Sequence, residues 1–395
     1  MMIAVFRLGT FIPVPGLNRE VLKGLVESNG GNNLFGMLNA FSGGAFSNAT
    51  IFAMGITPYI NSSIIIQLLT VAIPALERMM KEGEEGRKKM ASWTRYLTVI
   101  LAFIQATGLF FGLKNAVVSA NILSYVIITL TFTAGTAFLM WLGEQITENG
   151  VGNGISIIIF AGIVSSLPTD VYVMAMNVIA NPTTAQIVKV SAIVIVAILS
   201  VLFVIFMDNA ERRISVQYAK RMVGRKMYGG QSTHIPIKVS MAGVIPIIFA
   251  MSILSFPQTL GTMLGKTWNW INPTSWWYIG IYFLLIIFFT YFYTAIQFNP
   301  IEIANNMKKN GGFVPGIRPG KPTSDFISRA MTRITLAGAF FLGIIAILPM
   351  LAGKYTGINM SLGGSSLLIL VGVALETVRQ IESQMLMRHY KGFLE

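Results

Sequence analysis

The segment GITPYINSSIIIQLL, residues 55–69, combines the apolar character of a membrane span with many polar side chains. It lies within a longer apolar run at 51–73, which is long enough to cross a bilayer core of about 30 Å. The polar or helix-breaking residues of this run are Thr57, Pro58, Asn61, Ser62, Ser63 and Gln67. Lipid cannot satisfy such groups, so we expect this helix to be enclosed by neighbours or to line a water-filled space.

The composition places most of the chain in a membrane. Hydrophobic residues make up 54% of the 395 residues and charged residues only 11%, whereas a soluble domain has about 25% charged residues. Apolar windows of about 20 residues predict membrane-spanning helices. Unbroken windows lie at 93–113, 122–142, 187–207 and 276–298, and windows broken by glycine, proline or hydroxyl residues at 51–73, 155–167, 239–260, 334–351 and 362–378.

The first twelve residues, which include Arg7, are too short to span a bilayer alone. We interpret them as the end of a first span whose beginning is missing from the chain. An uncleaved signal peptide is the alternative, although a basic flank and a small-residue cleavage site are absent. The count is then ten spans, and the sequence predicts an all-α polytopic membrane protein.

Basic residues gather on one side of this topology. Of the 29 Lys and Arg residues, 22 fall in four stretches on that side, at 78–95, 212–238, 308–333 and 379–391, and six fall on the other. By the positive-inside rule the basic side is cytoplasmic, and ten spans place both termini there. Most of the net charge of +13 therefore reflects topology.

Two cytoplasmic connections, 208–238 and 299–333, are longer than topology requires. Loops longer than about 15 residues usually have a function of their own, and both connections are basic and rich in turn residues. We expect a docking platform for a large acidic partner, such as a ribosome or an acidic soluble protein. A merely solvated loop is the alternative.

The predicted spans divide after the fifth, at the connection 168–186. Each half has a broken span early in its series, at 51–73 in the first half and at 239–260 in the second. An odd number of spans per half inverts the second half relative to the first. The sequence thus predicts two inverted five-helix halves, 1–175 and 176–395, with a site near the midplane of the membrane.

Residues that carry covalent chemistry are absent or badly placed. There is no Cys, and His234, His389 and all three aspartates fall in predicted loops. No nucleotide-binding loop or hydrolase motif occurs. The acidic residues nearest the spans lie at their ends, whereas coupled transporters usually keep an ionisable group inside the membrane. We therefore predict no enzyme, no metal and no cofactor, and a passive conduit or a scaffold.

Isoleucines at helical spacing suit the seal of such a conduit. Ile56 and Ile60 are one turn apart, as are Ile155 and Ile159, so each pair shares a helix face. A ring of β-branched side chains with restricted rotamers suits a constriction of fixed diameter that excludes water. Isoleucines that merely face lipid or pack against neighbouring helices are the alternative, and spacing alone does not decide.

Long motifs along the chain carry a family resemblance. They are GTFIPVPG at 9–16, AFSGGAFSNATIFAMGITPYINSSIIIQLLT at 40–70, WLGEQITENGVGNGISIIIFAGIV at 141–164, QSTHIPIKVSMAGVIPIIFA at 231–250, GGFVPGIRPGKPT at 311–323 and GGSSLLILVGVALETV at 363–378. Together they closely resemble the bacterial SecY family over nearly every residue. Two departures are the incomplete first helix and Ser240, where relatives often carry Asn.

The resemblance implies a protein-conducting channel shaped like an hourglass, with two halves that hinge and release apolar segments sideways into lipid. It assigns residues to four roles. The pore ring is Ile56, Ile60, Ile159, Ile248 and Ile369; the plug, at 39–48, includes Asn39, Phe41, Ser42, Gly43, Gly44 and Phe46; the lateral gate carries Asn61, Gln67, Gln105 and Ser240; and partner docking uses Arg212, Arg213, Lys220, Arg221, Arg225, Lys226 and Arg318.

The expected plug is a short helix below the ring in the closed state. Its adjacent glycines and its serines indicate a flexible, weakly anchored element that moves at low cost. An ordinary re-entrant loop is the alternative. The resemblance further implies that the gate, between spans two and three on one side and seven and eight on the other, opens when a signal sequence replaces its polar contacts.

The resemblance also implies partners and a location. They are the small membrane subunits SecE and SecG, the SecA motor ATPase, the ribosome, substrates with signal sequences, and the lipid of the bacterial plasma membrane. Energy is then supplied from outside, by SecA with ATP, by a translating ribosome or by the membrane potential. An inverted-repeat secondary transporter, which needs a saturable small-molecule or ion site, and an assembly scaffold are the alternatives.

Overall fold

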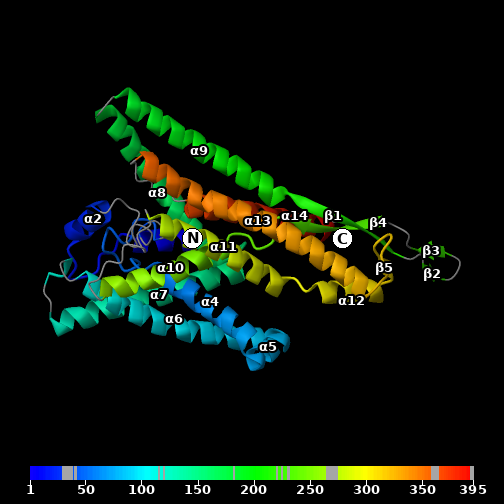
Figure 1. The fold of residues 1–395 in the computed structure, drawn as a ribbon. Helices are drawn as coiled ribbons and strands as arrows, with labels where there is room; N and C mark the ends of the chain where they lie inside the picture. Colours follow the sequence, from blue (N-terminus) through cyan, green and yellow to red (C-terminus); the bar gives the residue numbers. More distant parts are fainter. Residues whose placement is uncertain are drawn as a thin grey trace.

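The computed structural model describes residues 1–28, 39, 42–113, 116–118, 121–180, 183–218, 221–223, 226–228, 232–263, 275–356 and 364–391. Most of these residues are helical, and the long helices run lengthwise through the molecule (Figure 1). The helix α2 lies at one end, whereas α5, α12 and the strands lie at the other (Figure 1). The molecule therefore has two ends that differ in structure.

Ten helices coincide with the ten predicted spans. They are α1 (Met2–Gly9), α4 (Thr57–Ala72), α6 (Glu84–Gly112), α7 (Ile122–Asn149), α8 (Gly154–Ala180), α9 (Thr184–Asn209), α10 (Ile245–Met263), α11 (Trp276–Gln297), α13 (Lys321–Thr356) and α14 (Gly364–Lys391). Three further helices are α2 (Arg19–Ser28), α5 (Pro74–Lys81) and α12 (Pro300–Lys309). Within the described residues, six helices are long and apolar enough to cross a membrane, or seven if the bent pair α4 and α5 is one span. The count of ten is consistent with the structure.

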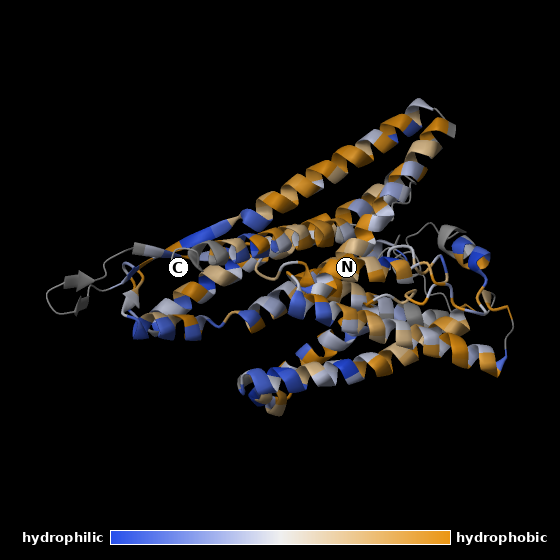
Figure 2. Ribbon diagram, turned by 180° about the vertical axis from the view of Figure 1, so that it is seen from behind, coloured by the Kyte–Doolittle hydropathy of each residue, from blue (hydrophilic) through white to orange (hydrophobic). Residues whose placement is uncertain are grey.

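The helices differ in how much of their surface neighbouring helices cover. The apolar window of α9 has a mean hydropathy of 3.1 and only 17% of it is buried, whereas half of the window in α13 is buried. Hydrophobic residues dominate the middle of the long helices, and hydrophilic residues gather toward the ends (Figure 2). This distribution is typical of helices that expose apolar side chains to lipid.

Three predicted boundaries are wrong. Residues 51–56 form turns, so α4 begins at Thr57, with Pro58 in its first turn, where the missing N–H of proline is tolerated. Likewise α10 begins at Ile245, because residues 239–244 form turns. The predicted connection at 168–186 is largely helical, because α8 continues through Pro168, and a membrane helix tolerates the loss of one backbone hydrogen bond.

The long connection 208–238 contains strands, not the expected irregular loop. Strands β1 (Glu211–Tyr218) and β4 (Ser232–Lys238) pair antiparallel, with Glu211 opposite Lys238, and β2 (Arg221–Val223) pairs with β3 (Lys226–Tyr228). The connection 299–333 holds α12, the short strand β5 (Gly312–Phe313) and the start of α13. Because β5 pairs with the other edge of β1, both connections share one sheet, in the order β4-β1-β5.

The helices of the two predicted halves meet mainly at two seams. Among the described elements, α10 packs against α4 and α6, and α14 packs against α8. Within the first half the sequence neighbours α4, α6, α7 and α8 pack in order, and within the second half α11 packs between α10 and α13. The apolar core is thus continuous across both seams.

Candidate functional site

The five predicted ring isoleucines come together. Ile56 precedes α4, Ile60 lies in α4, and Ile159, Ile248 and Ile369 belong to α8, α10 and α14. All five lie in one apolar cluster, and Ile56, Ile159 and Ile369 are 3%, 3% and 1% exposed. Positions more than 300 residues apart therefore meet in one place.

The surroundings of these isoleucines are apolar as well. Leu139, Leu142 and Ile146 of α7 and Val373 of α14 are buried in the same cluster. Water needs two or more polar partners to enter such a space, and hydrocarbon side chains offer none. An apolar constriction of this kind blocks water and ions without any covalent or ionic barrier.

The plug segment packs directly against this cluster. Ser42, Gly43, Ala45 and Phe46 are buried or nearly so, and Ala45 belongs to the same apolar cluster as the isoleucines. Phe46 packs instead into a neighbouring cluster formed largely by α6 and α7. Of the residues assigned to the plug, Phe41 lies outside the described residues.

The described plug residues differ from the expected helix. Residues 42–49 form consecutive turns, in which Gly43 and Gly44 have φ angles of 65° and 85°. The amide N–H of Gly44 donates to the carbonyl of Asn39 at 2.9 Å, and that of Ser47 donates to Asn39 Oδ1 at 2.9 Å. Such side-chain acceptors compete with helical hydrogen bonds. Ser42, Gly43, Ala45 and Phe46 are buried in this conformation, and the expected low cost of moving the segment stays a prediction.

Two arginines outside the predicted site donate hydrogen bonds to the predicted plug segment. Arg7 of α1 donates from Nη1 to the carbonyl of Gly43 at 2.9 Å, and Arg19 of α2 donates from Nη2 to Asn48 Oδ1 at 2.6 Å. The signal that could have revealed Arg7 is a cation inside an apolar stretch, which usually marks a specific partner. No comparable signal marks Arg19.

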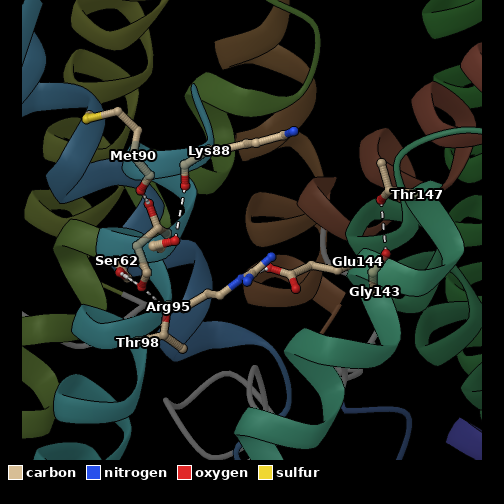
Figure 3. A network of polar contacts seen from close by, with 10 residues as sticks. Ser62, Lys88, Met90, Arg95, Thr98, Gly143, Glu144 and Thr147 are labelled. Carbon is tan, nitrogen blue, oxygen red and sulfur yellow. Dashed lines mark hydrogen bonds and ion pairs between the residues drawn. The ribbon is translucent and has the colours of Figure 1, made fainter. Parts of the chain in front are cut away.

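Hydrogen bonds and an ion pair join α4, α6 and α7 (Figure 3). The buried hydroxyl of Ser62 donates to the carbonyl of Thr94 at 2.7 Å, which connects α4 to α6. Arg95 Nε reaches across to Glu144 Oε1 at 2.7 Å, which connects α6 to α7 (Figure 3). These contacts link three helices of the first half on one side of the seam with α10.

The predicted gate residues do not bond to one another. Asn61 and Gln67 lie in α4 and Gln105 in α6, all half-buried, whereas Ser240 lies in the turns before α10. In the described part of the chain no hydrogen bond joins Asn61, Gln105 and Ser240, and Asn61 Oδ1 is buried without a partner. The expected polar contacts across the gate are therefore absent from this conformation.

The predicted docking residues surround a packed unit at the end of the bundle. Ile214, Val216 and Ile237 of the sheet pack with Met307 of α12 and Ile327 of α13 in one apolar cluster. Arg212, Arg213 and Arg318 are exposed on this unit, and Arg213 Nε pairs with Glu211 at 2.7 Å. Arg221 and Lys226 lie in β2 and β3, whereas Lys220 and Arg225 are outside the described residues.

In the parts of the chain that the structure describes, no group of three or more His, Asp or Glu residues is placed to hold a metal ion. The sites consist instead of an apolar constriction shared by helices of both predicted halves, a buried segment against it, and an exposed basic end. This combination defines a gated helical membrane channel.

Comparison with known proteins identifies the family. The SecY family model matches residues 50–378, and the chain belongs to this family. It is 48% identical to the protein translocase subunit SecY of Halalkalibacterium halodurans and to that of Bacillus subtilis, in each case over 100% of this chain and 95% of the relative. Identity to the subunit of Streptomyces galbus is 46%, over 99% and 94%.

Solved structures show the same fold. One described as the structure of a protein conducting channel has a TM-score of 0.69 at 18% identity, covering 97% of this chain and 90% of that chain. One described as Sec61 in a canine ribosome-channel complex has a TM-score of 0.65 at 17% identity, with the same coverage. The predicted helical membrane-channel fold is confirmed, and with the relatives the predicted function, a protein-conducting channel subunit of the Sec translocase, is confirmed as well.

Proposed function

We propose that unfolded secretory polypeptides cross the membrane through the ring of Ile56, Ile60, Ile159, Ile248 and Ile369. The observation that carries this proposal is the meeting of these five side chains, from α4, α8, α10 and α14, in one apolar cluster. Isoleucine side chains make no directional bonds, so they can close around chains of any sequence and close again afterwards. The channel itself performs no covalent chemistry.

The segment 39–48 acts as the plug of the closed channel. Burial of Ser42, Gly43 and Ala45, of which Ala45 belongs to the ring cluster, supports this role, because a segment in that position blocks the path on one side of the constriction. A solved structure of the same fold, with a TM-score of 0.68, is described as showing that the plug domain of SecY stabilizes the closed state. Opening then requires the plug to leave.

The lateral gate opens at the seam between α10 and the pair α4 and α6. The bonds from Ser62 to Thr94 and from Arg95 to Glu144 support this division, because they favour movement of α4, α6 and α7 as one body. Asn61 and Gln67 belong to α4 and Gln105 to α6, the helices on one side of this seam, and Ser240 lies in the turns that precede α10. An apolar signal sequence that enters there shifts the population toward the open state.

The basic unit of β1, β4, β5 and α12 docks the partner that supplies energy. Exposure of Arg212, Arg213 and Arg318 on a folded unit supports docking over a solvated loop. We place the SecA motor and the ribosome here, and a similar channel is described in complex with a canine ribosome. SecE and SecG bind alongside in the bacterial plasma membrane, and both termini lie in the cytoplasm.

A crosslink tests the conduit directly. Because the chain has no Cys, Ile248→Cys introduces a single thiol that can pair with one Cys in a secretory chain stalled during export. We expect a disulfide that depends on the signal sequence. Ile195→Cys, on a residue of α9 that is 56% exposed on the lipid-facing helix, is the matched control and should give none.

The contrary result is equally specific. If no disulfide forms at Ile248 or at the other four ring positions while engagement of the stalled chain is confirmed, the ring is not the path. An assembly scaffold then becomes the better description. Saturable uptake of a small molecule or ion by the same preparation would instead favour a secondary transporter.

A further inference from the structure

The side chain of Arg7 lies between the plug and α8. Its Nη1 atom donates to the carbonyl of Gly43 at 2.9 Å and to Ser165 Oγ at 3.1 Å. One guanidinium on α1 thus joins the plug segment to a helix that contributes Ile159 to the ring. A charged donor makes stronger hydrogen bonds than a neutral one, and a low-dielectric site strengthens them further.

Among the described residues, this cation has no acidic counter-charge. In the described part of the chain no carboxylate lies within ion-pair distance of Arg7, which instead lies over the ring of Phe11, 5.0 Å from its centroid. An ionisable group in a membrane segment is costly unless it has specific partners. Arg7 therefore depends on Gly43 and Ser165, and departure of the plug removes one of these two acceptors.

The plug residue that Arg7 contacts approaches α8 through its backbone. A Cβ atom at Gly43 would lie 2.8 Å from Ser165 Oγ and 3.0 Å from the Cα of Gly162, closer than normal packing allows. Its φ angle of 65° also favours glycine. This close approach brings the Gly43 carbonyl within reach of Arg7. The hydrogen bond from Arg7 and the packing of Gly43 against α8 therefore both require the closed position of the plug.

We propose that Arg7 is the positioning residue that holds the plug in the closed channel. The proposal rests on the plug function proposed above for 39–48. Each opening must break the bond from Arg7 to Gly43, so this bond lowers the frequency with which an idle channel opens. It thereby raises the strength of signal sequence that the channel requires before it admits a substrate.

Chemical labelling tests the proposal in the assembled translocase in membranes. Ser42 is 1% exposed, so the thiol of a Ser42→Cys variant of the otherwise Cys-free chain is protected from a maleimide while the plug is closed. In this background we expect Arg7→Gln to raise the labelling rate at position 42 at least about tenfold, since bonds to charged groups commonly shift equilibria by this factor. Arg7→Lys, which keeps the charge, should restore part of the protection.

Two controls separate a released plug from a damaged fold. Thr98 in α6 is 0% exposed, and the thiol of Thr98→Cys should stay protected in the Arg7→Gln protein. Ser165→Ala removes the second acceptor of Arg7, together with the bond from Ser165 Oγ to the carbonyl of Gly162 at 2.8 Å, but keeps the bond from Arg7 to Gly43. It should have a smaller effect than Arg7→Gln. Unchanged labelling at position 42 in the Arg7→Gln protein overturns the proposal, as does an equal increase at position 98.

A disulfide lock tests the underlying plug function independently of Arg7. A Cβ at Gly55 would lie 3.6 Å from Ser42 Cβ, a separation suited to a disulfide, so Ser42→Cys with Gly55→Cys should pin the plug when oxidised. We expect export to stop on oxidation and to resume on reduction. Export that continues through the oxidised pair disproves a movable plug. Blocked export together with unchanged labelling at position 42 in the Arg7→Gln protein disproves only the role of Arg7.

Discussion

The apolar closure was predicted from a family resemblance carried by long motifs, and the basic end from the length and charge of two connections together with that resemblance, yet the two are built in opposite ways. The ring isoleucine Ile369 is 1% exposed and lies in an apolar cluster to which α1, α4, α7, α8 and α10 also contribute. The side chain of Arg213 is 68% exposed, and its ion pair with Glu211 lies within one strand. Because Ile369 is buried, its packing depends on the conformation of the whole bundle. Because the side chain of Arg213 is exposed, it can contact a partner without a change in the bundle.

The difference determines what a substitution can change. In the proposed closure, a new side chain alters packing and hydrogen bonds of the closed state, so we expect it to shift the balance between closed and open channel. In the basic end, an exposed charge contributes about 0–1 kcal/mol to folding. A substitution there should leave the closed channel intact and change only the binding of the partner.

The largest expected effect is that of a polar residue in the ring. Ile369→Asn removes a buried side chain, which costs about 2–5 kcal/mol, and leaves a buried amide unsatisfied, which adds about 1–3 kcal/mol. We expect water to enter the ring, the ion leak of idle channels to rise, and proteins with defective signal sequences to be exported. Ion conductance and export assays measure both effects.

Ile381→Asn is the control for this prediction, because Ile381 lies on the same helix but is 42% exposed. It should leave conductance unchanged. If the Ile369→Asn channel shows no greater ion leak and still rejects proteins with defective signal sequences, the apolar cluster does not form the seal. The contrast with the basic end would then not hold.

A smaller effect is expected for the plug, where two adjacent glycines allow a matched pair. Both have positive φ, so Ala at either position costs about 1–2 kcal/mol of backbone strain. At Gly43 the new Cβ also meets Ser165 and Gly162 at 2.8–3.0 Å, whereas at Gly44 the nearest atom belongs to Asn48 and is 4.0 Å away. Gly43→Ala should therefore increase the ion leak more than Gly44→Ala does. Equal leaks would mean that the plug does not press against α8 in the idle channel.

The smallest effect on the channel itself is expected at the basic end. Arg318 is exposed in the turn before α13, between Gly316 and Gly320, and its carbonyl accepts a hydrogen bond from Thr323 Oγ1 at 2.9 Å. Arg318→Glu keeps this backbone bond, so the thermal unfolding temperature and the ion leak should stay as in the parent protein. Motor-driven export should fall, because the reversed charge repels an acidic partner.

Arg329→Glu is the matched charge reversal, on an exposed residue of α13 eleven positions along the chain. It should reduce export less than Arg318→Glu does. Equal losses for the two variants would attribute the effect to net charge, and normal export in Arg318→Glu would exclude Arg318 from the docking surface.

Much of the fold was predictable because the membrane imposes simple rules on sequence. Runs such as 122–142 and 276–298 must be helical, since lipid satisfies no backbone group, and the structure has α7 and α11 there. Helix ends were less predictable. Pro168 predicts the end of a helix in water, yet α8 continues past it, because the membrane offers no better conformation for the chain.

The candidate site was predictable to different degrees in its parts. Ile56 and Ile60 share a helix face by spacing alone, but their meeting with Ile159, Ile248 and Ile369 depends on the packing of four helices. The plug sequence indicates flexibility, because glycine and serine reduce helix propensity. Its burial depends on contacts from α1, α2 and α8 that local sequence cannot encode.

The sequence by itself determined that this chain is a helical membrane protein, because composition and period are local properties. It also predicted that most of the basic residues lie on one side and which motifs carry the function. Only the tertiary structure decided that 208–238 and 299–333 share one sheet, that the gate residues do not bond to one another, and that Arg7 reaches Gly43. Each of these outcomes depends on which distant segments meet. That pairing is set by packing of the whole bundle, a property that no single stretch of sequence contains.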